Sequence, residues 1–208
     1  MRTWTFLALA AAALLVPTAS RAQLSIGLRA GYAKASGDLA KIGGETVSQE
    51  DFVSSQIPIQ LDLDYRLFLG LTAGVYASYG FGDVSDAAAG CSATGVSCTG
   101  RIIRAGVQAT FTFPVPLLKP WIGAGFGYEW ARVGRSNAKA LTASGLEAFN
   151  GQLGLDLDLG YLRVGPFLTY TLGKYGADTL SDGVVGTADV EAARHGFLYY
   201  GLRVRIDP

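Results

Sequence analysis

The sequence predicts an all-β fold, an eight-stranded antiparallel up-and-down transmembrane β-barrel, and three observations support this prediction. Eight segments alternate apolar and polar residues, as expected for strands with a side-chain period of two. Within these segments almost every charge falls on the polar side of the alternation. An N-terminal export signal precedes all eight segments.

The start of the chain has the three parts of a secretory signal peptide. Arg2 gives a positive start, an apolar stretch follows, and Ser20 and Ala22 are the small residues of a cleavage site. The apolar stretch is shorter than the roughly 20 residues that a transmembrane helix needs. We therefore expect 1–22 to be removed and 23–208 to form a single outer-membrane β-barrel domain.

The first four strands are defined by their two contrasting faces. In the first, Arg29 lies opposite a face of leucine, isoleucine, alanine and tyrosine. In the second, Asp62 and Asp64 alternate with leucines, and in the fourth Arg104 lies on the polar face. These strands are predicted over 24–33, 57–67, 69–81 and 101–113.

The last four strands show the same alternation. In the fifth, Glu129 lies between two aromatic residues of the apolar face, and its glycines superficially resemble a nucleotide-binding motif. That motif requires a helix to follow, whereas here the strand continues, so we assign the glycines to close packing inside a barrel. These strands are predicted over 121–132, 148–160, 164–172 and 195–206.

The connections between the strands alternate in length. Short turns are predicted around Phe68, over 114–120, where prolines cannot donate the hydrogen bonds of a strand, and over 161–163. Long loops are predicted over 34–55, 82–100, 133–147 and 173–194. Outer-membrane barrels have short periplasmic turns and longer external loops. We therefore expect the long loops to lie outside the cell.

The charges on the polar faces distinguish a membrane barrel from a soluble one. Five are positive and five are negative, which predicts pairing inside a closed lumen. A soluble lipocalin-like barrel would have the reverse arrangement, apolar inside and polar outside. We name this predicted set the lumen charge network, and it comprises Arg29, Asp62, Asp64, Arg66, Arg104, Glu129, Asp156, Asp158, Arg203 and Arg205.

The remaining basic and aromatic residues agree with a membrane location. An arginine that faces lipid costs about 2–4 kcal/mol at mid-membrane and far less at the interface. The arginines expected to point outward all lie near strand ends: Arg101, Arg132, Arg163 and Arg194. Aromatic residues are expected to form a girdle at each membrane interface. The periplasmic girdle is predicted to contain Phe68, Phe113, Trp121 and Tyr161, and the external one Tyr32, Tyr79, Phe81, Tyr128, Trp130 and Tyr170.

The two cysteines and the bulk charge limit the chemistry that we expect. Cys91 and Cys98 lie in one small-residue loop of an exported chain, which predicts a disulfide. A metal site would need more ligands nearby, so we expect no metal and no cofactor. The formal net charge is zero, which argues against nucleic acid as a partner.

The end of the last strand carries a recognisable motif. Tyr199, Gly201, Val204 and Ile206 have the spacing of the C-terminal signal that the outer-membrane assembly machinery reads. Together with the strand pattern, this motif resembles the small eight-stranded outer-membrane barrels of the OmpA/OmpX/Opa type. The chain departs from that family by ending in Asp and Pro where a terminal Phe is usual. The resemblance implies outer-membrane lipid, lipopolysaccharide and the assembly machinery as partners. Because the sequence ends after the eighth strand, we expect no C-terminal peptidoglycan-binding domain.

The sequence favours a non-enzymatic role. Some barrels of this size modify lipid A, and in one such family a catalytic His has a Ser two residues later. The single histidine, His195, has Phe197 at that position, and we expect it at the external rim. We predict a monomeric structural or surface-interaction protein that binds through its external loops. The alternatives are a narrow porin-like channel for small solutes, a lipid A-modifying enzyme and a soluble lipocalin-like binder.

Overall fold

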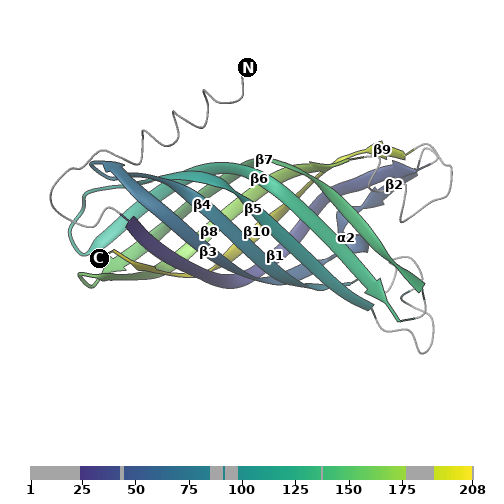
Figure 1. Ribbon diagram of the computed structural model, residues 1–208, viewed down its shortest axis with the longest axis horizontal. Coiled ribbons are helices and arrows are strands. Elements are labelled where there is room, and N and C mark those ends of the chain that lie inside the picture. The colour runs from purple at the N-terminus through teal and green to yellow at the C-terminus, as the bar shows by residue number, and fades with distance from the viewer. Residues whose placement is uncertain are drawn as a thin grey trace, which may run out of the picture.

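The computed structural model describes residues 24–42, 45–84, 91, 98–136, 138–176 and 190–207, and the expected signal peptide lies outside these residues. Eight long antiparallel strands form a closed barrel (Figure 1). They are β1 (Leu24–Ile42), β3 (Ser55–Phe68), β4 (Leu71–Asp83), β5 (Cys98–Thr112), β6 (Leu118–Arg135), β7 (Ala138–Asp158), β8 (Leu162–Tyr175) and β10 (Arg194–Ile206). Consecutive barrel strands pair with each other, and pairing of β10 with β1 closes the sheet. The predicted fold class is confirmed.

The barrel strands turn their apolar side chains outward and their polar side chains inward. Along β3, Leu61 and Leu63 are 53% and 42% exposed, whereas Asp62 and Asp64 are 1% and 3% exposed. A soluble barrel of the same topology would bury the leucines instead. This polarity is that of a membrane barrel and excludes the lipocalin-like alternative.

The short turns and both described chain ends lie at one end of the barrel, which we call the short-turn end (Figure 1). Two turns contain a glycine in the left-handed region, Gly70 at φ +78° and Gly160 at φ +89°. The turn predicted over 114–120 is shorter in the structure, because β6 already includes Pro120. The carbonyl of Pro120 accepts a hydrogen bond of 2.9 Å from the Phe113 N–H, so a proline is compatible with this strand start.

The opposite end, which we call the hairpin end, contains more strand than predicted. The predicted loop 133–147 is largely a hairpin, in which β6 and β7 stay paired as far as Arg135 and Ala138. The predicted loop 34–55 is also wrong in part, because β1 continues to pair with β2 (Glu45–Ser48) and β9 (Val190–Ala192). Strands that extend beyond a membrane face water or other parts of the protein instead of lipid. They keep their backbone ladder but lose the alternation that reveals a strand in the sequence.

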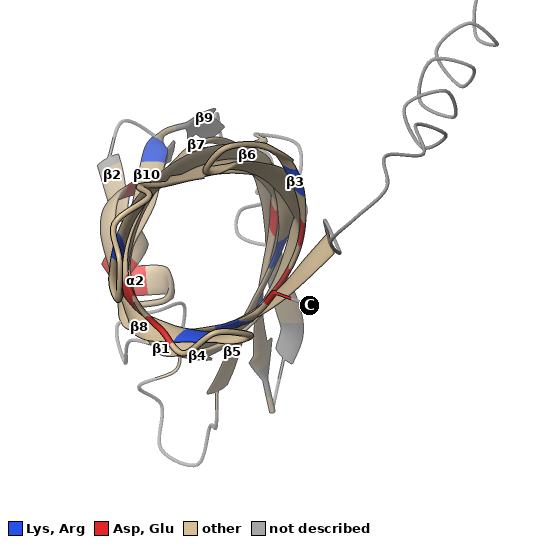
Figure 2. Cartoon of the chain, turned by 90° about the vertical axis from the view of Figure 1, so that its left-hand side faces the viewer, with Lys and Arg blue, Asp and Glu red and all other residues tan. Residues whose placement is uncertain are grey.

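A short helix, α2 (Gln49–Phe52), folds back towards the barrel interior at the hairpin end (Figure 2). The Ser48 hydroxyl caps this helix by accepting a hydrogen bond of 3.1 Å from the Glu50 N–H. Phe52 and Val53 are buried. They belong to a larger cluster of buried apolar side chains. We call the part of this cluster at the hairpin end the apolar plug, and it comprises Phe52 and Val53 with Ala33, Ala35, Leu39, Ile102, Ala131, Val133, Ala143 and Phe197. The plug fills the hairpin end of the lumen with side chains.

The sequence also predicts features of the cysteines and the long loops. Cys91 and Cys98 form the predicted disulfide, which joins the start of β5 to the preceding loop. Parts of the long loops that we expected to bind partners, 85–90, 92–97 and 177–189, lie outside the described residues. No helix in the described part of the chain is long and apolar enough to cross a membrane.

Candidate functional site in the barrel lumen

Large side chains fit inside the barrel because glycines face them from nearby strands. A Cβ atom on Gly154 would lie 2.6 Å from the Trp121 ring, and one on Gly127 would lie 2.5 Å from the Tyr76 hydroxyl. Both distances are too short for real contacts, so these positions exclude any larger residue. The glycines of β6 therefore serve lumen packing, as the continuing strand indicated.

The middle of the lumen is crossed by a polar layer centred on Arg29 of β1. Its Nε donates to Asp62 Oδ2 at 2.6 Å, and its Nη1 donates to Gln152 Oε1 at 2.6 Å. Gln152 in turn donates to Gln108 at 3.1 Å. These four residues come from β1, β3, β7 and β5, so the layer joins opposite sides of the barrel. A buried guanidinium requires such a full set of acceptors.

An aromatic ring and an ion pair lie beside this layer. Trp121 Nε1 donates to Asp156 Oδ1 at 3.0 Å, and Asp156 also pairs with Arg203. The Arg203 guanidinium carbon lies 3.6 Å from the centroid of the Trp121 ring, which is a cation–π contact. All three side chains are almost fully buried. The sequence placed Trp121 in the periplasmic girdle, which is wrong because odd-numbered residues of β6 face the lumen.

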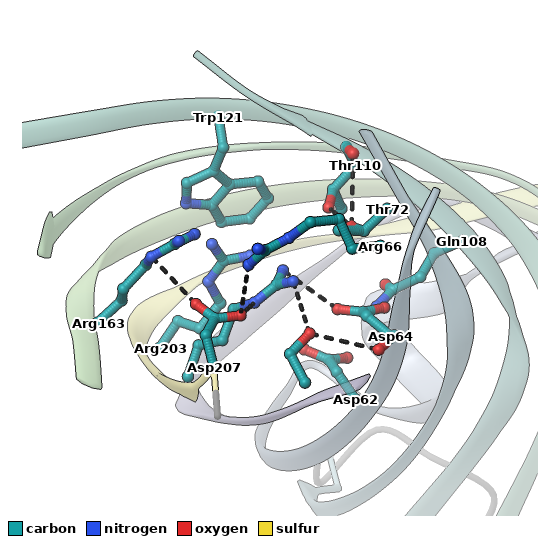
Figure 3. Close-up of polar contacts among 12 residues, drawn as sticks. Asp62, Asp64, Arg66, Thr72, Gln108, Thr110, Trp121, Arg163, Arg203 and Asp207 are labelled. Atoms are coloured by element: carbon teal, nitrogen blue, oxygen red, sulfur yellow. Dashed lines mark hydrogen bonds and ion pairs between the residues drawn. The ribbon is translucent and has the colours of Figure 1, made fainter. Parts of the chain in front are cut away.

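A denser group of charges lies at the short-turn mouth of the lumen, around Asp207 (Figure 3). Arg205 Nε donates to Asp207 Oδ1 at 2.9 Å, Arg163 Nε lies 3.1 Å from Asp207 Oδ2, and Arg66 Nη2 lies 3.8 Å from Asp207 Oδ1. Arg205 Nη1 also donates to Asp64 Oδ2 at 3.3 Å. The expected outward orientation of Arg163 is wrong, because the described end of the chain supplies an acidic partner inside the mouth.

The rim of the same mouth contains a further pair. Lys119 Nζ lies 2.5 Å from Asp158 Oδ2, and Arg163 Nε lies 4.0 Å from Asp158 Oδ1. A cavity of about 340 Å³ opens here between the basic side chains of Arg66, Lys119, Arg163 and Arg205. Each of these four basic side chains forms an ion pair with at least one of the three carboxylates Asp64, Asp158 and Asp207.

Towards the hairpin end, the next charged layer is the pair of Arg104 and Glu147. Arg104 Nε donates to Glu147 Oε2 at 2.5 Å and its Nη2 donates to Oε1 at 2.9 Å, which makes the pair bidentate. The Tyr76 hydroxyl donates to Glu147 Oε1 at 2.8 Å, and the Tyr199 ring lies 4.4 Å from the Arg104 guanidinium carbon. Glu147 was missed in the sequence because it lay in a segment predicted to be loop.

Between this pair and the apolar plug lies a cluster of Glu129, Tyr175 and His195. The Tyr175 hydroxyl donates to Glu129 Oε1, and His195 Nε2 lies 3.4 Å from the same oxygen. The Tyr175 and His195 rings are stacked with centroids 3.9 Å apart. His195 is therefore buried inside the barrel and not at the external rim as expected. Its inward orientation follows from its odd position in β10, which it shares with Arg203 and Arg205.

The structure thus gives each member of the predicted lumen charge network a definite place. Eight of the ten side chains are buried in the lumen, and the other two, Arg66 and Asp158, are partly exposed at the short-turn mouth. Sequence reasoning missed their partners Glu147, Lys119, Arg163, Asp207, Tyr76, Tyr175 and Trp121. For Trp121 and Arg163 a strict odd–even count within the strand would have given the inward orientation.

The motif residues of the last strand divide between the two faces of the wall. Tyr199 faces the lumen, where its hydroxyl accepts a hydrogen bond of 3.1 Å from Gln56 Nε2. Gly201 lies directly opposite Gly31 of β1, while Val204 and Ile206 face outward. Among the described residues, no group of His, Cys, Asp and Glu is arranged to hold a metal ion.

Comparison with solved structures finds the same fold in one of them, and two others are reported as similar. Neisserial surface protein A is 16% identical, with a TM-score of 0.56 over 91% of this chain and 100% of that one. OprG from Pseudomonas aeruginosa is 14% identical, with a TM-score of 0.48 over 90% and 98%. E. coli Outer Membrane Protein W is 16% identical, with a TM-score of 0.44 over 88% and 97%. No protein-family model and no curated sequence matches. The chain has the fold of the small eight-stranded outer-membrane β-barrels that its sequence resembles.

Proposed function

We propose that this chain is a non-enzymatic integral outer-membrane protein with a structural or surface-interaction role. The filled lumen is the observation that carries this proposal. From the short-turn mouth to the hairpin end, the lumen contains the Asp207 group, the Arg29 layer, the Arg104–Glu147 pair and the apolar plug. Eight strands leave an interior that side chains can just fill. A barrel filled in this way acts through its outer surface and its hairpins.

The orientation of the barrel follows from the lengths of its connections. Outer-membrane barrels place short turns in the periplasm and longer connections outside. The hairpin end, with the β6–β7 hairpin and β2, then faces the exterior. Closure of β10 onto β1 leaves no unpaired edge in the barrel, which supports a monomer. The assembly machinery would read the motif of β10, and lipid and lipopolysaccharide would contact the apolar outer wall.

A narrow channel is the second candidate, and the cavity at the short-turn mouth is the observation in its favour. An ion entering from this cavity would next meet the buried pair of Arg29 and Asp62, whose closest atoms are 2.6 Å apart. Passage would require separation of this pair and then of Arg104 and Glu147. Leaving either partner of a buried pair alone costs about 3–5 kcal/mol. We therefore infer that the resting barrel does not conduct.

A lipid A-modifying enzyme is supported less well. A lipid substrate approaches a membrane barrel from its outer wall, whereas His195 and Glu129 face the lumen and are each 3% exposed. The Tyr175 ring is stacked on the His195 ring, and the apolar plug lies on the side of the hairpin end. The site has no direct path to the membrane, which favours a structural role for the histidine.

The orientation can be tested by epitope insertion at the two ends of the barrel. An epitope after Ser136, at the tip of the β6–β7 hairpin, is expected to bind antibody on intact cells. The same epitope after Gly160 is the matched control, because this turn lies at the other end and a Cβ on Gly160 meets nothing within 4 Å. It should bind antibody only after the outer membrane is permeabilised. Labelling of intact cells at Gly160 but not at Ser136 would show that the barrel has the opposite orientation to the one proposed.

A further inference from the structure

The outer wall of the barrel carries a groove that is formed mainly by outward-facing residues, with Ala131 and Ala143 of the apolar plug at its base. It lies near the hairpin end, across β4, β5, β6 and β7, and has a volume of about 480 Å³. It is lined mainly by apolar surface and by two arginines, and its lining includes Tyr79, Arg101, Ile103, Trp130, Arg132 and Thr142. A concave site of mixed apolar and cationic character on a membrane-facing wall suits an amphiphilic anion.

The two arginines of this groove are direct neighbours. Arg101 of β5 pairs in register with Arg132 of β6, and both side chains are exposed. Like charges directly opposite each other in a sheet repel. Among the described residues no acidic side chain forms an ion pair with either arginine. An anion placed between the two guanidinium groups would remove this repulsion.

The register places the arginines at the level of lipid headgroups. The next outward-facing pair towards the short-turn end is Ile103 and Trp130, and Ile103 is also paired with Tyr79. Tyrosine and tryptophan mark the membrane–water interface of a barrel. The arginines lie two residues beyond this aromatic level, or about 7 Å further out along the strands. An anionic head beside the arginines would therefore have its acyl chain against Ile103 and Trp130.

We propose that this groove binds a phosphorylated, acylated glycolipid of the external leaflet, of the lipid A type. Arg101 and Arg132 bind the phosphate, to which the planar guanidinium can donate two hydrogen bonds, and the groove below them holds an acyl chain. This site deepens the lipid contact named above and rests on the proposed orientation, with the hairpin end outside. The lumen layers take no part in it.

Trp130 provides a direct reporter of binding. After removal of the signal peptide the chain keeps two tryptophans, Trp121, which is 1% exposed in the lumen, and Trp130, which is 45% exposed in the groove. The protein is refolded in phosphatidylcholine vesicles and titrated with diphosphorylated lipid A that carries brominated acyl chains. Quenching is expected to saturate in the wild type and to disappear in Trp130→Phe.

The arginines are tested with a matched pair of double variants. Arg101→Ala with Arg132→Ala is expected to raise the lipid A concentration at half-saturation by at least about tenfold, because two charge-assisted contacts are lost. The control is Lys174→Ala with Arg194→Ala. Lys174 and Arg194 are also basic, exposed and directly paired, on β8 and β10, but they do not line the groove. This control should titrate like the wild type.

Three outcomes would overturn the proposal. The first is an unchanged titration of the Arg101/Arg132 variant, with its heat-dependent gel shift showing a folded barrel. The second is equal quenching by brominated lipid A without phosphates, which would show that the groove does not recognise the phosphate. The third is full displacement of the lipid by inorganic phosphate, which would make a free anion the ligand. Because binding is measured in refolded vesicles, these results are independent of the epitope experiment in cells.

Discussion

Replacement of Glu147 by Ala is expected to lower the free energy of unfolding by about 3–5 kcal/mol. Arg104 is then left as a buried cation without the carboxylate that now accepts two of its hydrogen bonds. Tyr76 loses its acceptor as well. The measurement is a urea titration of the protein refolded in lipid vesicles, followed by tryptophan fluorescence.

Two controls separate the loss of pairing from a general effect of substitution. The combination of Arg104→Met with Glu147→Leu removes both charges and should recover most of the lost stability, because no unpaired ion remains. Lys34→Ala removes a partner from an exposed pair with Glu50 and should change stability by less than about 1 kcal/mol. If Glu147→Ala were as stable as the wild type, Arg104 would have to be solvated by water inside the lumen.

The second large effect is expected at Trp121. Its replacement by Ala should destabilise the barrel by about 3–5 kcal/mol, the usual range for deletion of a large buried aromatic side chain. The substitution leaves a void opposite Gly154 and removes the cation–π contact with Arg203 and the hydrogen bond to Asp156. The same urea titration measures the loss, with Trp130 of the outer wall as the remaining fluorophore.

The matched control for this prediction is Trp130→Phe. Trp130 is an outward-facing residue of the same strand, and phenylalanine keeps an aromatic ring there, so a loss below about 1 kcal/mol is expected. Similar losses for the two substitutions would contradict the difference between a packed lumen and a lipid-facing wall. A small loss for Trp121→Ala alone would indicate that the lumen is less tightly packed than its contacts show.

The strand faces could be predicted from the sequence because a closed barrel imposes one simple rule on every strand. Leu61 faces the outer surface and Asp62 faces the polar lumen, and this contrast produces the alternation with a period of two that is visible in the sequence. The same rule placed Arg29, Arg104 and Arg203 in the lumen. It also explains Ile102 and Phe167, apolar residues at polar positions, which are buried inside and do not face lipid.

The hairpin end could not be predicted in the same way. Past the membrane surface both strand faces meet water or other parts of the protein, so the alternation weakens while the ladder continues to Arg135. Helix α2 has four residues, too few to show a helical period. Glu147 and the plug residues Leu39, Phe52, Val53, Val133 and Ala143 lie in segments that were predicted to be loops, so the sequence did not reveal them. The partners within the lumen also depend on strand stagger, which the sequence alone does not give.

The most direct test of the filled lumen is electrical. The folded protein is incorporated into planar lipid bilayers, and current is recorded at fixed voltages with a known porin as the control for incorporation. We expect no stepwise conductance above that of the lipid alone, because the Arg29 and Arg104 layers and the apolar plug fill the cross-section of the barrel. Regular conductance steps from heat-modifiable, folded protein would contradict a filled lumen and would make the narrow channel the better account of this barrel.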